Sequence, residues 1–203
     1  PFRTEPQLVK ALRPSQVYEK GSADSFFYWV EHGTFDVGHL AIYDARVFEN
    51  AKNNLDLLRR LLSMVLDGSL TLHEKVDAPW ETIAGFGGDR HIAKKVIALV
   101  HPEKVFSIFN TKHFGYFASR LGIDPGRLTG ERFHKEFKDA TVGERFEALN
   151  DALLEWRDEN APGVDNLTLA IFLYESLPPP LERGRRLRSG RTSGRYELLP
   201  GLR

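Results

Sequence analysis

The sequence predicts a mainly α-helical, compact domain of about six helices, and three observations support this class. Several stretches place apolar residues at intervals of three and four, which is the period of a helix with one buried face. Glycine or proline punctuates the ends of these stretches. With 203 residues, 41% of them hydrophobic, the chain is long enough to bury one core. We therefore expect a helical domain over residues 1–178, with room for a few short strands near its N-terminus.

The N-terminal third holds one short and one long predicted helix. The stretch SADSFFYWVEHGTFDVGHLAIY, residues 22–43, is rich in aromatic and β-branched residues and is broken by glycines. We expect a short helix over 25–32, followed by irregular or strand-like chain. Asp44 is a suitable N-cap for a long helix that Gly68 would end. Six apolar residues repeat at helical spacing along it: Phe48, Ala51, Leu55, Leu58, Leu62 and Val65.

A glycine-rich loop, GFGGD at 85–89, separates two further helical segments. Pro79 suits a first helical turn, after which Trp80 and Ile83 should face the core. The segment HIAKKVIALV, residues 91–100, resumes helix until His101 and Pro102 stop it. The pattern is typical of a helix-hairpin-helix unit, in which glycines let backbone N–H groups approach a DNA phosphate. The loop is one or two residues longer than that hairpin, so a plain turn between helices is the alternative.

The C-terminal half predicts three more helices and a tail. Asn110 or Thr111 can cap a helix that Gly122 ends. Residues 142–157 and 164–177 give two amphipathic helices, and the acidic side chains of 144–159 are most simply a solvated face. Residues 179–203 are rich in Pro, Gly, Ser and Arg, which indicates a linker or an exposed basic tail.

Composition narrows the class of protein. The formal net charge is zero, but residues 85–135 carry 9 Lys and Arg against 4 Asp and Glu, and residues 136–178 carry 3 against 10. Any DNA binding would therefore use a local surface. The chain has no cysteine, no apolar run of membrane-spanning length and no signal-peptide core in PFRTEPQLVK, so we expect a cytoplasmic location. The seven histidines lack metal-ligand spacing, and we expect no metal and no cofactor.

The segment VFSIFNTKHFGYFASRLGI, residues 105–123, resembles the part of helix-hairpin-helix DNA glycosylases that carries their catalytic aspartate. That position is Asn110 here. An amide is neither charged nor basic near neutral pH, so it cannot stabilise a cationic centre or activate a nucleophile. We expect Asn110 to cap a helix instead.

Two blocks together resemble the region ahead of the motor in McrB-type AAA+ restriction ATPases. These are DSFFYWVEHGTFDVGHLAIY, residues 24–43, and HPEKVFSIFNTKHFGYFASRLGI, residues 101–123. The chain departs from that pattern at Ser107, where proline is common, and in a shortened glycine-rich run in the first block. The resemblance implies an N-terminal domain that recognises duplex DNA, often by a modified base. A motor in the same polypeptide, absent from this chain, would recruit a nuclease subunit, and the basic tail would begin the linker to it.

The sequence thus leads to a DNA-binding specificity domain as the first hypothesis. The expected DNA contacts are Gly85, Gly87, Gly88, Arg90, Lys94 and Lys95, with Lys104, Lys112 and His113 as second-rank contacts. An extruded base would need an aromatic pocket, for which Tyr28, Trp29 and Trp80 are candidates. Two alternatives remain open: a protein-interaction module that uses residues 144–177 or the tail, and an active glycosylase whose acid would be Asp124 or Asp89.

Overall fold

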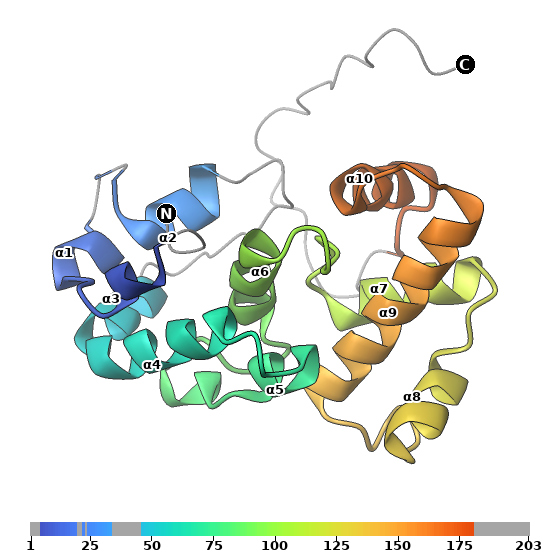
Figure 1. Ribbon diagram of the computed structural model, residues 1–203, viewed down its shortest axis with the longest axis horizontal. Helices are drawn as coiled ribbons and strands as arrows, with labels where there is room; N and C mark the ends of the chain where they lie inside the picture. The colour runs from blue at the N-terminus through green and yellow to red at the C-terminus, as the bar shows by residue number, and fades with distance from the viewer. Residues whose placement is uncertain (1–4, 20–21, 23, 34–45, 181–203) are drawn as a thin grey trace, which may run out of the picture.

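The computed structural model describes residues 5–19, 22, 24–33 and 46–180, and this part of the chain is mainly α-helical, as predicted (Figure 1). Ten α-helices and no strand occur among these residues. The irregular or strand-like chain expected after residue 32 falls largely on 34–43, outside the described residues. The helices are α1 (Pro14–Val17), α2 (Phe26–Tyr28), α3 (Arg46–Asn53), α4 (Leu55–Leu66), α5 (Leu72–Asp77), α6 (His91–Val100), α7 (Thr111–Arg120), α8 (Pro125–Phe133), α9 (Val142–Asn160) and α10 (Asn166–Ser176).

The single long helix predicted after residue 44 is two helices, α3 and α4, separated at Asn54. Asn54 leaves helical geometry, with ψ at 43°, and its side-chain amide donates to the Asn50 carbonyl at 2.8 Å. Asparagine side chains compete for backbone hydrogen bonds in this way and so favour helix ends. The short helix predicted over 25–32 is present as α2, continued by a π-helical turn over Trp29–Gly33. The predicted cap Asp44 lies outside the described residues.

Three of the α-helices in the described residues, α1, α5 and α8, were not expected, although the start signals of α5 and α8 are in the sequence. Thr71 and Glu74 form a reciprocal capping box at the start of α5, with the Thr71 N–H donating to Glu74 at 2.8 Å. Asp124 caps α8, and Pro125 occupies its first turn. The helix expected from Pro79 is instead a three-residue 3-10 helix, η4, at Trp80–Thr82.

Helix α9, 19 residues long, packs against α5, α7 and α8 (Figure 1). Phe146, Leu149 and Leu153 are fully buried along it. The expectation of a solvated acidic face is wrong for Glu144 and Glu147, which are buried. Each has a cationic partner, because Lys135 binds Glu144 at 2.6 Å and Arg132 binds Glu147 at 2.6 Å. Ion pairing is what allows carboxylates to lie inside this part of the fold.

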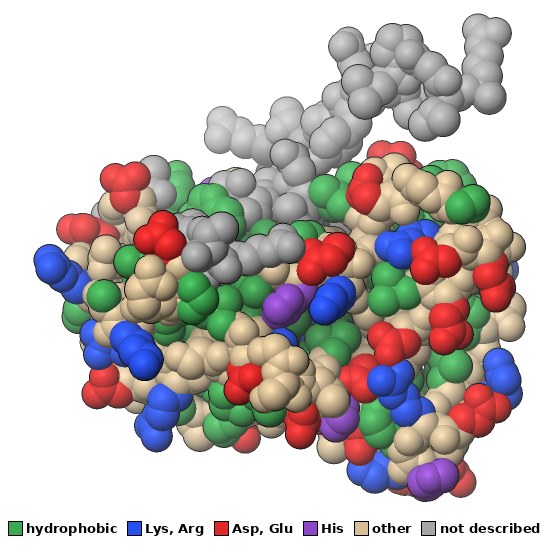
Figure 2. Space-filling model, viewed as in Figure 1, with side chains coloured by type: hydrophobic (Ala, Val, Ile, Leu, Met, Phe, Trp, Pro, Cys, Tyr) green, Lys and Arg blue, Asp and Glu red, His purple; other side chains and the backbone are tan. Residues whose placement is uncertain are grey.

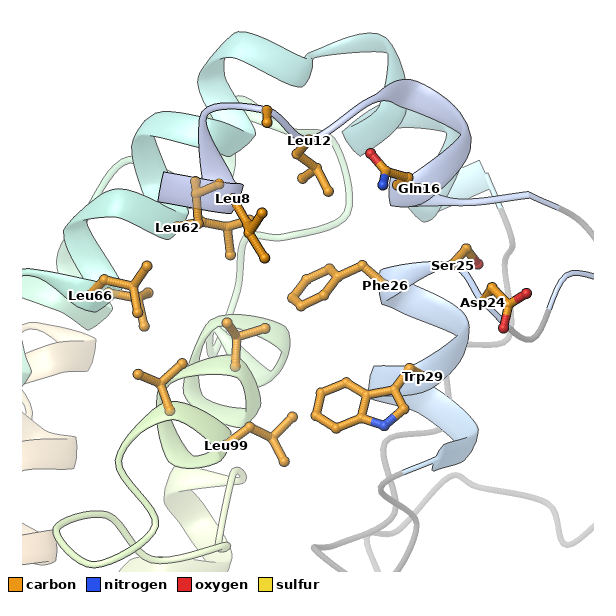
Figure 3. A pocket seen from close by; sticks show the side chains of 15 residues that line it. Leu8, Leu12, Gln16, Asp24, Ser25, Phe26, Trp29, Leu62, Leu66 and Leu99 are labelled. Carbon is orange, nitrogen blue, oxygen red and sulfur yellow. The ribbon is translucent and has the colours of Figure 1, made fainter. Parts of the chain in front are cut away.

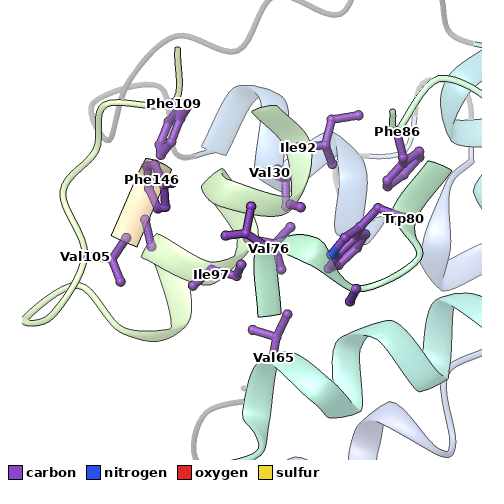
Figure 4. Packing of buried hydrophobic residues seen from close by; sticks show 14 of the residues in the cluster. Val30, Val65, Val76, Trp80, Phe86, Ile92, Ile97, Val105, Phe109 and Phe146 are labelled. Carbon is purple, nitrogen blue, oxygen red and sulfur yellow. The ribbon is translucent and has the colours of Figure 1, made fainter. Parts of the chain in front are cut away.

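One continuous core extends from Val9 to Leu173, and Trp80 and Phe86 contribute stacked aromatic rings to it (Figure 4). Trp80 and Phe86 lie parallel, with ring centroids 6.2 Å apart. Trp80 and Ile83 are fully buried, as predicted. Within the described ranges no helix has the length and apolar character needed to cross a membrane. The tail predicted over 179–203 falls outside the described residues from 181 onward.

Candidate functional site

The glycine-rich loop joins η4 to α6. Gly85 and Gly88 have φ values of 98° and 62°, in the left-handed region that glycine adopts without strain. Arg90, the residue before α6, also has a positive φ of 58°. Because the element ahead of the loop is only three residues of 3-10 helix, the helix-hairpin-helix unit is not confirmed.

The carboxylate of Asp89 occupies the end of this loop, where a phosphate was expected. It accepts hydrogen bonds from the Thr111 N–H at 2.7 Å and from the Lys94 ammonium at 2.8 Å, and the His91 ring lies 3.0 Å away. Burial would raise the pKa of Asp89, but the hydrogen bonds from His91, Lys94 and Thr111 and the Lys94 charge outweigh it and lower the pKa well below its usual range. The backbone N–H group of Thr111, at the start of α7, therefore already holds an anion that belongs to the protein.

The expectation that Lys94 and Lys95 contact DNA phosphate is corrected by their burial, since both are 0% exposed. Besides Asp89, Lys94 donates to the Thr111 hydroxyl at 2.7 Å and to the Phe109 carbonyl at 3.2 Å. Burial lowers the pKa of Lys94 to about 8, although Asp89 opposes the shift. Burial likewise lowers the pKa of Lys95 to about 8, against the charge of Glu31. Both lysines act inside the fold in this structure.

The other predicted contacts come from separate elements. The Arg90 guanidinium is paired with Glu81 at 2.5 Å. Lys104 and Lys112 are exposed, whereas His113 is half-buried, with its ring nitrogen 3.3 Å from the Tyr174 hydroxyl. Gly88 is exposed and Gly87 half-buried. Acidic and basic side chains are interspersed among the coloured residues of Figure 2, so the face shown there carries no continuous basic patch.

One of the three predicted base-pocket residues lines a pocket. A pocket of about 470 Å³ lies between the N-terminal segments, α4 and α6, and Trp29 forms part of its wall. The Trp29 side chain is 43% exposed, and Figure 3 shows Trp29 and Phe26 pointing toward the aliphatic side chains across the pocket. Tyr28 is half-buried and lies beside His32 instead, with ring centroids 4.5 Å apart. Trp80 is 0% exposed and donates its indole N–H to the Lys75 carbonyl at 2.9 Å, so it cannot stack on a base.

The walls of this pocket are mainly aliphatic, with polar groups on one side (Figure 3). Asp24, Ser25 and Gln16 supply the polar groups. The Ser25 hydroxyl donates to the Ser22 carbonyl at 3.2 Å, and the Gln16 side-chain oxygen accepts from the Arg13 N–H at 2.8 Å. The exposed Asp24 carboxylate can accept hydrogen bonds from an amino group. The arrangement suits a flat or apolar group that carries a donor at one edge.

Sequence reasoning missed the pocket wall contributed by residues 8–12. The signal was present in PQLVKAL, where Leu8, Val9 and Leu12 recur at helical spacing, but the segment is too short to reveal its partner helices. No group of three or more His, Asp or Glu side chains in the described part of the chain could hold a metal ion.

Asp89 and Asp124, the two acids considered for a glycosylase, both have structural partners. Asp89 is bound as above, and Asp124 accepts from the Gly126 N–H at 2.9 Å at the start of α8. Asn110 accepts from the Lys112 N–H at 2.9 Å and the His113 N–H at 3.3 Å, which confirms that it caps α7. No known protein family, curated protein or solved structure matches this chain.

Proposed function

We propose that this chain is a DNA-binding specificity domain that receives an extruded base in the Trp29 pocket. The observation that carries the proposal is the half-exposed Trp29 indole beside Phe26 at an open pocket of about 470 Å³. Enzymes and readers that extrude a base hold it by stacking on aromatic side chains and by hydrogen bonds to its edge. Asp24, an exposed residue of the pocket lining, carries an acceptor that an exocyclic amino group of cytosine or adenine could reach only at the edge of the pocket.

The resemblance to McrB-type proteins supports the same proposal and adds its biological setting. The domain would recognise modified duplex DNA in a restriction system, on behalf of an AAA+ motor and the nuclease subunit that the motor recruits. A pocket that encloses an extruded base can contact the edge of the base together with a modification on it.

The burial of Lys94 and Lys95 moves the phosphate contacts to other side chains. Lys10 and Arg13 are exposed and flank Leu12, which lines the pocket. Lys112 is a third exposed cation, on α7. Each phosphate contact should make the affinity fall by about 0.9 log unit per log unit of salt on duplex DNA.

The test is a fluorescence anisotropy titration of one labelled duplex, unmodified or carrying 5-methylcytosine, 5-hydroxymethylcytosine or N6-methyladenine. We expect salt-dependent binding that is tightest to one modified probe. Trp29→Ala should weaken that binding roughly tenfold or more, because stacking contributes about 1–3 kcal/mol per base. Phe172→Ala is the matched control, since Phe172 is 56% exposed on α10 and does not line the pocket. Equal affinities of wild type and Trp29→Ala would overturn the proposal.

A second candidate is a protein-interaction module. Ile171 and Phe172 are adjacent on α10 and are 44% and 56% exposed. Helices that are apolar on every face are normally buried, so an exposed pair of this kind favours contact with another protein surface. This candidate predicts no salt-dependent DNA binding, and loss of partner binding in Phe172→Ala but not in Trp29→Ala.

A further inference from the structure

A second pocket, of about 390 Å³, lies between the start of α5, the end of α6 and the middle of α9. Unlike the Trp29 pocket, it is lined by many charged side chains. Its ionisable lining residues are Lys75, His101, Lys104, Arg132, Glu147 and Asp151. The proposed DNA-reading function uses none of these groups except Lys104, which was predicted as a second-rank contact.

The Lys75 ammonium group is buried with too few acceptors. Lys75 is only 6% exposed, and its one hydrogen-bond partner in the described part of the chain is the His101 ring, with Nζ 3.3 Å from Nε2. The same His101 nitrogen lies 2.9 Å from the Val65 carbonyl oxygen. A single ring nitrogen cannot donate to Val65 and accept from Lys75 at once. Whichever tautomer is present, either Lys75 Nζ or the Val65 carbonyl is left without its hydrogen bond to His101.

The part of the pocket formed by Lys75, His101 and Lys104 carries an excess of positive charge. Burial lowers the pKa of Lys75, and the charge of Lys104 lowers it further, while Asp67 opposes the shift. Burial also lowers the pKa of His101, as do the charges of Lys75 and Lys104, whereas its contact with Val65 and the charge of Glu103 act in the opposite direction. The three side chains are therefore close enough to repel one another.

The two acidic side chains of the pocket, Glu147 and Asp151, already have a cationic partner. Arg132 binds Glu147 at 2.6 Å and also pairs with Asp151. Glu147 further accepts from the His73 N–H at 2.6 Å. Because Arg132 and the two carboxylates pair with each other, neither of these carboxylates forms an ion pair with Lys75 or Lys104. Asp67 acts on Lys75 without a hydrogen bond to it in the described part of the chain. The pocket has room for a small ligand and a surplus of hydrogen-bond donors at one end.

We propose that this pocket binds an oxyanion of the phosphate type, held by Lys75 and Lys104 beside His101. Charge-assisted hydrogen bonds from ammonium groups to phosphate oxygens are strong, and a bound oxyanion would give the buried Lys75 the acceptors that it lacks. The site takes either free phosphate or a phosphoryl group of a small molecule or of a DNA backbone. The proposal stands apart from the Trp29 pocket and does not depend on the proposed function.

The test is isothermal titration calorimetry, in which the whole chain is titrated with sodium phosphate near neutral pH. A titration with sodium chloride of matched ionic strength is the reference. We expect saturable binding of one phosphate with a Kd in the millimolar range or below. Lys75→Met should weaken it about tenfold or more, and Lys104→Ala about threefold. Lys52→Met is the matched control, since Lys52 lies on α3 away from the pocket, and it should bind as wild type.

Two results would overturn the site: no saturable binding beyond that of chloride, or unchanged affinity in Lys104→Ala. Lys104→Ala keeps the test decisive even if Lys75→Met fails to fold, because Lys104 is exposed. A competition with the labelled duplex then distinguishes the sources. Displacement of the duplex by phosphate assigns the site to a DNA phosphate, and undisturbed duplex binding assigns it to a small ligand. Trp29→Ala should leave the phosphate affinity unchanged, which separates failure of this site from failure of the DNA-reading pocket.

Discussion

The ammonium nitrogen of Lys94 lies 2.8 Å from the Oδ1 atom of Asp89, and this ion pair joins the glycine-rich loop to α6. Thr111 at the start of α7 donates to the same carboxylate, and Lys94 stands 5.0 Å from the centre of the Phe146 ring on α9. This one ion pair thus connects the loop and three helices. The glycine-rich loop and Lys94, which the sequence suggested as a phosphate-binding site, instead hold parts of the fold together.

Asp89→Ala should be the most destabilising change at this ion pair. It leaves the fully buried Lys94 ammonium without its carboxylate, which costs about 3–5 kcal/mol of unfolding free energy. Lys94→Met should cost less, about 1–2 kcal/mol, because methionine fits beside Phe146 and Asp89 keeps its bonds from Thr111. The double variant should lose clearly less than the sum of the single losses. Urea unfolding of the four proteins measures this, and strictly additive losses would contradict a coupled pair.

The stability of the fold should rise with pH in the alkaline range because of Lys95. Burial lowers the pKa of Lys95 to about 8 in the folded state, below its ordinary value of 10.5. Between these values the unfolded chain keeps a proton that the folded chain has lost, so the free energy of unfolding increases with pH. Lys94 contributes in the same direction.

Urea unfolding of wild type and Lys95→Met at about pH 7.5 and about pH 9.5 tests this dependence. The increase in wild type should exceed that in the variant by on the order of 1 kcal/mol. The window stays below about pH 10, where unfolded tyrosines begin to ionise. Identical pH dependence in the two proteins would show that Lys95 keeps its ordinary pKa when folded.

Capping residues and apolar periodicity predicted the helices well where these signals were strong. Helix α6 begins and ends where the sequence placed it, and Asn110 caps α7 as expected. Apolar periodicity predicted one continuous helix, but Asn54 divides it into α3 and α4. Periodicity indicates which face of a helix is buried, and it does not indicate where a polar side chain competes for backbone hydrogen bonds. The capping signals of α5 and α8 were strong enough to have predicted both helices.

The candidate site was harder to predict because burial of charge is a tertiary property. Lys94 and Lys95 look like surface cations in sequence, and only the positions of Asp89 and Phe146 show why Lys94 lies inside. The same limit hid Glu147, whose partners Arg132 and His73 are distant in sequence. Trp29 was named as a candidate without any knowledge of the wall opposite it, which residues 8–12, α4 and α6 build.

Replacing Asn110 should change only the unfolding free energy that its N-cap contributes to α7. Asn110→Ala removes the acceptor for the Lys112 and His113 N–H groups at the start of α7, and should cost about 1 kcal/mol. Asn110→Asp keeps the acceptor and should remain within about 0.5 kcal/mol of wild type. Asn53→Ala is the control, since Asn53 is exposed on α3. Thermal or urea unfolding gives the values, and equal losses in the Ala and Asp variants would refute the cap.

Gly143 is required by the close approach of α9 to α5. A Cβ atom at this position would lie 2.5 Å from Asp77 Oδ2 and closer still to the His73 carbonyl, while the Gly143 N–H donates to Asp77 at 2.8 Å. Gly143→Ala must therefore push the helices apart, and should cost about 1–3 kcal/mol or more of unfolding free energy. Gly115→Ala on α7 is the matched control, because a Cβ there meets nothing within 4 Å. It should stabilise the protein by about 0.4–1 kcal/mol through the lower entropy of the unfolded chain. Opposite signs for the two substitutions in urea unfolding would support this packing of α9 on α5, and a neutral Gly143→Ala would contradict it.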